Sequence, residues 1–299
     1  GAAPRRLPGA VGGDLPGVHV VRTRADVDAL APEIGEGRRA LIVGGGYIGL
    51  EAAAVCARRG MAVTVVELAE RILSRVACAE TAAFLRELHE NHGVKMREGT
   101  ALEALEAGPD GRVAAATLAG GEQVDADVVI VGIGIEPRTG LAGEAGLTLE
   151  NGIAVDGCCR TSDPAILAAG DCASFPYRGG RIRLESVQNA IDQGAHAARA
   201  MLGLEAPYVP VPWFWSDQYD ARLQIAGLGA GHDRIVTRPG HRAGGRSFWY
   251  FRGAELLAVD AVSDPRAYMQ GKRWIEAGVS PEPEALADPA RDLKGLAPA

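Results

Sequence analysis

Three glycines and one acid have the spacing that most directly indicates chemistry. Gly44, Gly46 and Gly49 form a G-x-G-x-x-G pattern, and Glu67 follows 18 residues after the last of them. The first glycine permits a tight turn, the second lets a pyrophosphate approach the backbone, and the third lets helix and strand pack closely. An acid at this distance can accept hydrogen bonds from the adenosine ribose hydroxyls. The pattern predicts a dinucleotide site that also contains the intervening Tyr47 and Ile48.

Glu67 favours NAD over NADP. A carboxylate about 4 Å from a 2′-phosphate charge costs roughly 4 kcal/mol at an effective dielectric of 20. The same carboxylate gains roughly 1.5 to 3 kcal/mol when it accepts ribose hydroxyls. Arg71 and Arg75 follow closely in the sequence. These arginines either weaken the preference for NAD over NADP or belong to a solvated helix face. In the first case Arg75 is a residue of the cofactor site.

The elements that must position these residues alternate between strand and helix. RALIVGG and AVTVVE read as apolar strands, with a helix over residues 48–59 between them and another helix over 78–92. TALEALEA and RVAAATLA flank the turn GPDG and predict antiparallel strands, after which DVVIVGIG returns to a buried parallel strand. This order predicts a parallel α/β domain.

The rest of the chain divides at changes in composition. The first residues are rich in glycine and proline and predict a connector, whereas APYVPVP at 206–212 predicts a linker. Residues 213–299 contain WFWSDQY and several strand-like runs, which indicate a small α+β domain. The proline- and alanine-rich tail after residue 281 is expected to fray.

Composition excludes several classes of protein. The net charge of −7 argues against a general nucleic-acid partner, and no apolar run approaches the roughly 18 residues that span a membrane. Five cysteines without a C-x-x-C pair and six scattered histidines indicate neither a redox dithiol nor a metal site. The odd number of cysteines fits a reducing, cytoplasmic location.

TSDPAILAAGDCA carries a second, weaker signal. Ala168, Ala169 and Gly170 end an expected strand and present Asp171 at its tip. A carboxylate there suits a chain of sugar-like hydroxyls. The alternative is a buried strand that ends at an ordinary turn.

Five motifs, taken together, resemble one family. GGGYIGLEAA, GIGIEPRT, TSDPAILAAGDCA, RLESVQNAIDQG and PWFWSDQYD are similar to the FAD-dependent ferredoxin reductases of bacterial oxygenase systems, the putidaredoxin-reductase-like and rhodocoxin-reductase-like branch of the glutathione-reductase-like flavoproteins. The resemblance implies an α/β fold in which a Rossmann-like NAD domain is inserted in a split FAD domain, followed by a C-terminal α+β domain. The implied division is 1–21 (remnant of the FAD domain), 22–137 (NAD domain), 138–208 (C-terminal half of the FAD domain) and 209–299 (C-terminal reductase domain). It further implies that the N-terminal part of the FAD domain is absent from this sequence.

The resemblance also implies cofactor-binding residues. For FAD they are Arg22, Asp171 at the ribityl chain, Glu185, Ser186 and Val187 at the flavin ring, and Trp215 beside it; the alternative for Trp215 is a core residue. For NAD they are Glu51 near the nicotinamide and the covering loop of Gly132, Ile133 and Gly134.

The implied activity passes a hydride from NADH to FAD and then single electrons to a [2Fe–2S] ferredoxin, which serves a monooxygenase or a dioxygenase. No acid, base or nucleophile is expected, because the cofactors carry the chemistry. A reductase of rubredoxin or of another acceptor, and a flavin-free NAD(H)-binding fragment, stay open as alternatives. Candidate ferredoxin contacts, or else simply solvated charges, are Arg178, Arg181, Arg183, Lys272 and Arg273.

Overall fold

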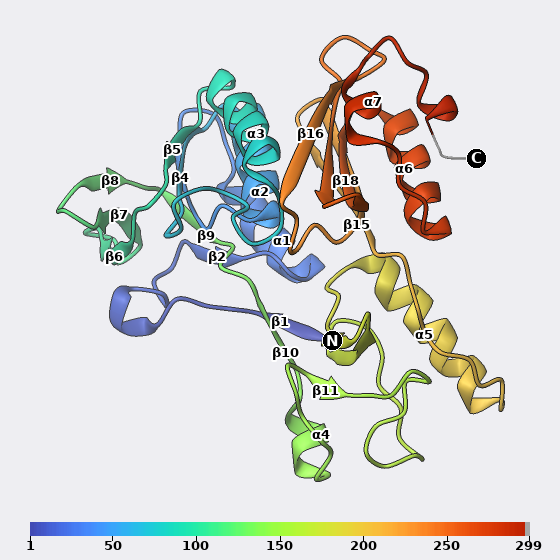
Figure 1. Ribbon diagram of the computed structural model, residues 1–299. Helices are drawn as coiled ribbons and strands as arrows, with labels where there is room; N and C mark the ends of the chain where they lie inside the picture. Colours follow the sequence, from blue (N-terminus) through green and yellow to red (C-terminus); the bar gives the residue numbers. More distant parts are fainter. Residues whose placement is uncertain (297–299) are drawn as a thin grey trace.

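The computed structural model describes residues 1–296 and shows three regions (Figure 1). A parallel domain (residues 18–131) and a C-terminal domain (residues 209–296) lie side by side. A lower lobe (residues 138–208) lies beneath them. The N-terminus lies next to this lobe.

The parallel domain contains a five-stranded sheet in the order β2-β9-β3-β4-β5, and all of its pairs are parallel. Both faces are buried, which explains why its strands are nearly continuous apolar runs. β6, β7 and β8 form a separate antiparallel sheet, as GPDG predicted. The elements are β2 (Val18–Val20), α1 (Arg24–Leu30), β3 (Arg39–Val43), α2 (Tyr47–Arg58), β4 (Ala62–Val66), α3 (Ala79–Asn91), β5 (Lys95–Arg97), β6 (Leu102–Ala107), β7 (Val113–Leu118), β8 (Gln123–Asp125) and β9 (Val128–Val131).

The N-terminal segment is more than a connector. β1 (Ala2–Pro4) pairs antiparallel with β10 (Ile135–Pro137), which leads from the parallel domain into the lower lobe. β2 forms the edge of the parallel sheet beside β9. The division at residue 22 therefore places one strand of this sheet outside the domain, because three apolar-rich residues are too short a run to read as a strand from sequence.

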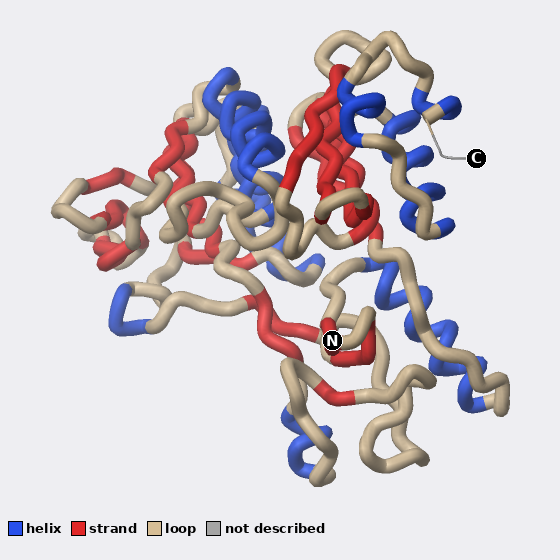
Figure 2. The backbone as a smooth tube through the Cα atoms, viewed as in Figure 1, coloured by secondary structure: helices blue, strands red, loops and turns tan. Residues whose placement is uncertain are grey.

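The lower lobe has little regular structure, and loops dominate it (Figure 2). Its elements are α4 (Gly140–Glu144), β11 (Ile153–Ala154), β12 (Ala173–Tyr177), β13 (Gly180–Ile182) and α5 (Val187–Met201). The strand expected before Asp171 is reduced to one bridge between Arg160 and Leu167. The Gly170 amide donates to the side chain of Gln193 at 2.7 Å, so a side chain takes the place of a strand partner.

The C-terminal domain is an antiparallel sheet in the order β14-β15-β18-β17-β16, with α6 packed on it. Within the described residues, the tail packs on this domain through Leu286, Leu293 and Leu296, where the sequence predicted fraying. Arg238 is buried and donates to the carbonyls of Leu286 and Asp288 at 2.8 and 2.7 Å. The elements are β14 (Trp213–Gln218), β15 (Ala221–Gly227), β16 (Arg234–Pro239), β17 (Arg246–Arg252), β18 (Glu255–Val262), α6 (Pro265–Ala277) and α7 (Pro283–Ala287).

The parallel and C-terminal domains share one core. Leu50 and Leu85 from the first domain pack in the same cluster as Leu223 and Phe248 from the second. Buried apolar contacts therefore fix the C-terminal sheet against α2 and α3. None of the helices within residues 1–296 combines the length and apolar character needed to cross a bilayer.

Candidate cofactor sites

The glycine turn between β3 and α2 has the geometry of a nucleotide cradle. Gly44 has φ of +108°, and a Cβ there would lie 2.4 Å from the Gly132 oxygen. A Cβ on Gly49 would lie 2.0 Å from the Gly44 oxygen, so this glycine is required by packing. A Cβ on Gly46 would meet nothing closer than 4.0 Å. The protein itself leaves the space at Gly46 free, as a dinucleotide pyrophosphate requires, so the turn fits the cofactor.

Glu67 is fixed beside this turn by backbone amides. Its two carboxylate oxygens accept the backbone N–H groups of Gly45 at 2.7 Å and Ala69 at 2.8 Å. An ionised carboxylate has about four acceptor positions, so two of these bonds leave capacity for ribose hydroxyls. The backbone therefore orients Glu67 before any ligand binds.

The two nearby arginines differ. Arg71 turns inward and donates to the carbonyls of Ile72 at 3.2 Å and Ala77 at 2.9 Å, which occupies its guanidinium. Arg75 is exposed, and its guanidinium lies 3.6 Å from the position of a Cβ on Gly134. Only Arg75 is therefore placed where it can reach a ligand in the turn.

The loop after β9 closes the same edge of the sheet. The Gly132 amide donates to the Val43 carbonyl at 2.7 Å, which holds the loop against the end of β3. Ile133 is 36% exposed at the surface of this loop. The glycine turn, Glu67 and this loop thus come together at the carboxyl ends of neighbouring parallel strands, where open α/β sheets bind ligands.

Glu51 lies where the C-terminal domain meets α2. Ser216 on β14 donates to its carboxylate at 2.6 Å, and burial raises the pKa of this carboxyl. Tyr47 and Phe214 pack with ring centroids 4.8 Å apart beside it. Ser216 was missed from the sequence, although it adjoins Trp215. Trp215 is half-buried, and its ring centroid lies 5.6 Å from that of Trp213.

A second cluster joins residues from distant parts of the chain. Arg22 donates to the Asp171 carboxylate at 2.9 Å across 149 residues of sequence. Arg183 donates to the Asp171 carbonyl at 2.9 Å and forms an ion pair with Glu185. Arg183, which sequence analysis had considered only for docking, thereby links Asp171 to Glu185, and Arg22 joins them through its own bond to Asp171.

The start of α5 completes this cluster. Ser186 caps the helix by accepting the Asn189 amide at 3.1 Å, and Val187 is 61% exposed beside it. Asn189 and Gln193 are buried on the inner face of α5. Their side chains bond the backbone of the two loops that carry Asp171 and Glu185, at Gly170 and Leu184. The sequence signal for these two residues was their i, i+4 spacing in QNAIDQ, which places Asn189 and Gln193 on one face of the helix.

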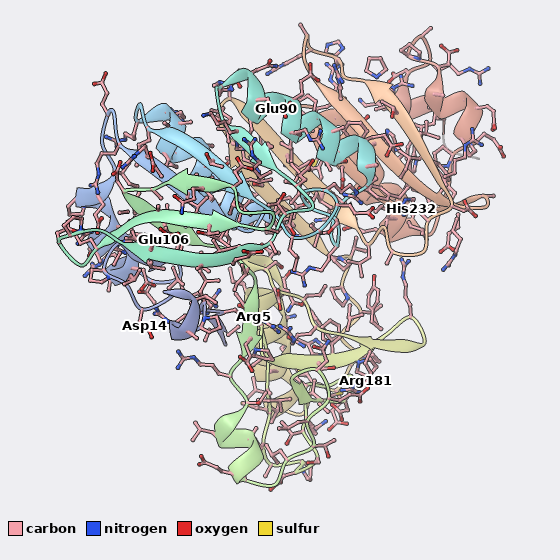
Figure 3. The ribbon with its side chains drawn as sticks, turned by 90° about the vertical axis from the view of Figure 1, so that its left-hand side faces the viewer. Arg5, Asp14, Glu90, Glu106, Arg181 and His232 are labelled. Atoms are coloured by element: carbon pink, nitrogen blue, oxygen red, sulfur yellow. The ribbon has the colours of Figure 1, made fainter. Side chains whose placement is uncertain are left out.

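Arg181 braces the lower lobe internally. It lies on β13 (Figure 3). Its guanidinium donates to the carbonyls of Val155 at 2.8 Å and Ser174 at 2.5 Å. With Arg183 tied to Asp171 and Glu185, these two arginines serve the packing of the lobe and not a free docking surface.

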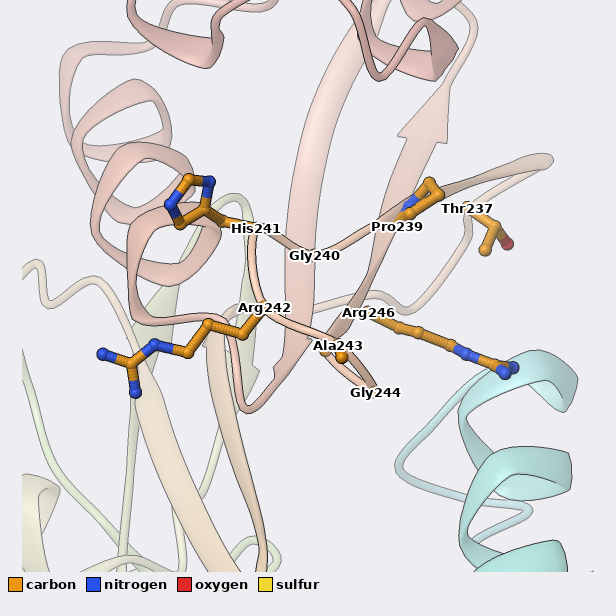
Figure 4. Close-up of a pocket in the computed structure, with 9 residues that line it drawn as sticks. Thr237, Pro239, Gly240, His241, Arg242, Ala243, Gly244 and Arg246 are labelled. Atoms are coloured by element: carbon orange, nitrogen blue, oxygen red, sulfur yellow. The ribbon is translucent and has the colours of Figure 1, made fainter.

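A surface hollow lies elsewhere, in the C-terminal domain. It has a volume of about 540 Å³ and is lined by the β16–β17 loop. Arg242 and Arg246 point in opposite directions there (Figure 4), and Arg246 lies 5.5 Å from the ring centroid of Phe84 on α3. Its charged groups diverge, so we assign no cofactor to this hollow.

These features define a flavin-type pyridine nucleotide oxidoreductase. They are the nucleotide turn on a parallel sheet, the second cluster around Asp171 and the C-terminal antiparallel domain. The family pattern described as pyridine nucleotide-disulphide oxidoreductase matches residues 1–194, and the one described as reductase C-terminal matches 213–297. The chain belongs to the ferredoxin reductases of this family, which confirms the resemblance and the α/β fold class. Membership implies FAD and NAD(P)H as cofactors.

Three relatives illustrate the match. The 5,5′-dehydrodivanillate O-demethylase ferredoxin reductase subunit of Sphingobium sp. is 44% identical, over 99% of this chain and 72% of the relative. Rhodocoxin reductase of Rhodococcus erythropolis is 41% identical, over 98% of this chain and 69% of the relative. The crystal structure of the covalent putidaredoxin reductase–putidaredoxin complex superposes with a TM-score of 0.94 at 38% identity, covering 99% of this chain and 72% of that one.

Proposed function

We propose that this protein is an NADH-dependent ferredoxin reductase of an oxygenase system. It takes a hydride from NADH and passes electrons singly to a [2Fe–2S] ferredoxin that serves a monooxygenase or a dioxygenase. The observation that carries the proposal is the presence of two separate cofactor clusters on one chain. One is the glycine turn with Glu67, and the other is the Arg22–Asp171 pair with Arg183.

The chain's own residues divide the work of binding. Free amides at the start of α2 face the phosphates of NADH. Glu67 holds the adenosine ribose, and Arg71 is occupied by backbone carbonyls, so NADH is preferred to NADPH. Asp171 and Arg22 hold the ribityl side of FAD, which supplies the conversion of a two-electron donor to single electrons when bound.

The cysteines support electron transfer without a dithiol. All five are free thiols, and burial raises the pKa values of Cys56 and Cys159 to about 11. Thiols with raised pKa values stay protonated at neutral pH and react poorly. Free thiols together with an NADH donor also support a location in the cytoplasm.

The experiment compares binding with electron transfer. The chain is supplied with FAD, and reduction by NADH of a [2Fe–2S] ferredoxin and of a rubredoxin is followed in parallel. We expect turnover with the ferredoxin. Asp171→Ala is expected to abolish turnover while leaving NADH binding intact, and Asp110→Ala, an exposed turn acid, serves as the matched control.

Two results would contradict the proposal. NADH binding with no uptake of flavin by the unaltered chain would indicate an NAD(H)-binding protein without this activity. Faster turnover with rubredoxin would indicate a reductase of another acceptor on the same fold.

A further inference from the structure

A tight turn just before α3 carries Arg75 beside the glycine turn. The amides of Val76 and Ala77 both donate to the Leu73 carbonyl at 3.0 Å, which closes the turn over residues 73–77. Arg75 lies in the middle of this segment and is exposed. We call the segment the Arg75 turn. The place that the guanidinium can reach depends on how the two ends of this turn are held.

The first end is fixed to the glycine turn. The Leu73 amide donates to the Gly45 carbonyl at 3.0 Å, and a Cβ on Gly45 would lie 2.6 Å from Ile72 Cγ2. Leu73 has φ of +53°, a left-handed conformation that a leucine keeps only where its surroundings enforce it. Ile72 and Leu73 are buried in the core that the parallel and C-terminal domains share. Packing therefore holds the start of the Arg75 turn in place.

The second end is fixed by the C-terminal domain. Cys78 follows the turn and is the N-cap of α3, and its backbone amide donates to the Tyr250 hydroxyl at 2.8 Å across 172 residues of sequence. An amide at the start of a helix has no acceptor within that helix, so Tyr250 supplies one. Both residues are buried, where an amide without an acceptor is destabilising. This bond connects the end of the Arg75 turn to β17.

The Tyr250 hydroxyl is itself oriented by Asp260 on β18. It donates to the Asp260 carboxylate, and Thr81 on α3 donates to the same oxygen at 2.7 Å. Burial raises the pKa of the Tyr250 hydroxyl, so the hydroxyl keeps its proton for Asp260. Its oxygen lone pairs are then left to accept the Cys78 amide.

We propose that Tyr250 is a positioning residue for NADH binding. By holding Cys78, it keeps the Arg75 turn against the glycine turn, with the Arg75 guanidinium beside the loop of Gly134. A cation held there attracts the negatively charged NADH. The inference rests on the proposed nucleotide site, and it gives the C-terminal domain a part in NADH affinity.

Hydrogen exchange of the cofactor-free chain tests whether Tyr250 holds the turn. Tyr250→Phe removes the acceptor and keeps the ring. We expect the Cys78 amide to exchange about fivefold faster, the equivalent of one net hydrogen bond, and the amides of residues 73–77 to follow it. Tyr268→Phe, at a buried tyrosine of α6, is the matched control and should leave these amides unchanged. Unchanged exchange in Tyr250→Phe would overturn the inference.

Fluorescence titration tests the consequence for NADH. We expect Tyr250→Phe to raise the Kd for NADH about fivefold, because the Arg75 charge is then no longer held at the site. An Arg75→Ala background separates this role from a purely structural one. There Tyr250→Phe should change the Kd by less than about twofold, because the two residues act as one unit. Tyr268→Phe should leave the Kd unchanged in both backgrounds.

Equal weakening by Tyr250→Phe in both backgrounds would overturn the inference, as would a normal Kd in the Tyr250→Phe single variant. Should Tyr250→Phe fail to fold, the unaltered chain decides the outcome. Its Cys78 amide should exchange as slowly as the amides of β17, and rapid exchange would contradict the role of Tyr250. An unaltered chain that shows this protection but does not bind NADH would refute the proposed function, and with it the role of Tyr250 in NADH affinity.

Discussion

The parallel domain and the lower lobe each present a predicted cofactor cluster, but they build it differently. In the parallel domain the site consists of backbone turns at strand ends, and eleven buried residues pack on each face of the sheet. Among the described residues, the hydrophobic cluster of the lower lobe has four buried members, Val155, Ala173, Phe175 and Tyr208. There the cluster is held by side chains that bond to distant backbone groups.

This difference predicts unequal stability. Each fully buried large apolar side chain contributes roughly 1.5 to 3 kcal/mol to the free energy of unfolding. Apolar burial therefore stabilises the parallel domain far more than the lower lobe. The lobe depends instead on bonds made by residues such as Arg183 and Gln193. A single change should therefore affect one region without the other.

The largest effect is expected at the glycine turn. Gly49→Ala places a Cβ 2.0 Å from the Gly44 oxygen, and a backbone clash of this kind exceeds ordinary overpacking, costing about 3 kcal/mol or more. We expect a lower Tm and loss of NADH binding. Gly46→Ala, with no atom closer than 4.0 Å, is the matched control. It should keep its Tm and lose only NADH affinity, and a normal affinity there would contradict the assignment of the cradle.

The next effect concerns the lobe. Gln193→Leu leaves the buried Gly170 amide without its acceptor, at a cost of about 1 to 3 kcal/mol. Because Gly170 precedes Asp171, FAD affinity should fall by about tenfold, the equivalent of 1.4 kcal/mol. NADH affinity should not change. Gln188→Leu, on the outer side of α5, is the control, and an equal loss of NADH affinity in Gln193→Leu would show that the two regions are not independent.

A pH-dependent effect is expected at the junction of the parallel and C-terminal domains. Asp260 is fully buried and accepts hydrogen bonds from Thr81 and Tyr250. Burial raises its pKa to about 6, from 3.8 in the unfolded chain. A raised carboxyl pKa means that the folded state binds the proton more tightly, so this group's contribution to stability decreases as the pH rises from 4 through 6.

Asp260→Asn removes that titration. The free energy of unfolding of the unaltered protein relative to Asp260→Asn should therefore be about 1 to 3 kcal/mol more favourable at pH 4.5 than at pH 8. Denaturant unfolding of both proteins at pH 4.5 and at pH 8 measures these free energies. Carboxyls whose pKa is lowered, such as those of Asp127 and Glu33, contribute equally to both proteins. Their contributions therefore cancel in the difference between the two free energies of unfolding. A difference that does not change with pH would refute the assignment.

The smallest effect is expected at Arg71. Its guanidinium is occupied by carbonyls, so Arg71→Ala should change the ratio of NADH to NADPH affinity by less than about twofold, within the range of ordinary surface substitutions. Arg75→Ala, exposed beside Gly134, is the comparison. A selective loss of NADPH binding in Arg71→Ala would show that this arginine reaches the 2′-phosphate.

Local patterns allowed much of the parallel domain to be predicted. The turn at Gly44, the strand that ends at Glu67 and the antiparallel pair around GPDG depend on neighbours within a few residues, and the structure has each of them. Here the sequence periodicity and the turn residues point to the same element.

Long-range side-chain contacts could not be predicted in this way. Arg22 meets Asp171 across 149 residues, and only the family resemblance connected them. Arg181 appeared to be free for docking because its acceptors are main-chain carbonyls, which carry no sequence signal. Ser216 has the same limitation, because its partner Glu51 lies 165 residues away.

Hydrogen exchange across the whole chain tests the central comparison most directly. We expect the amides of β3, β4 and β9 to exchange only with global unfolding, and those of β11, β12 and Gly170 to exchange at least about 100-fold faster through local opening of the lobe. Equal protection of the two regions would contradict the account, because the side-chain braces of the lobe would then hold it as firmly as a packed sheet.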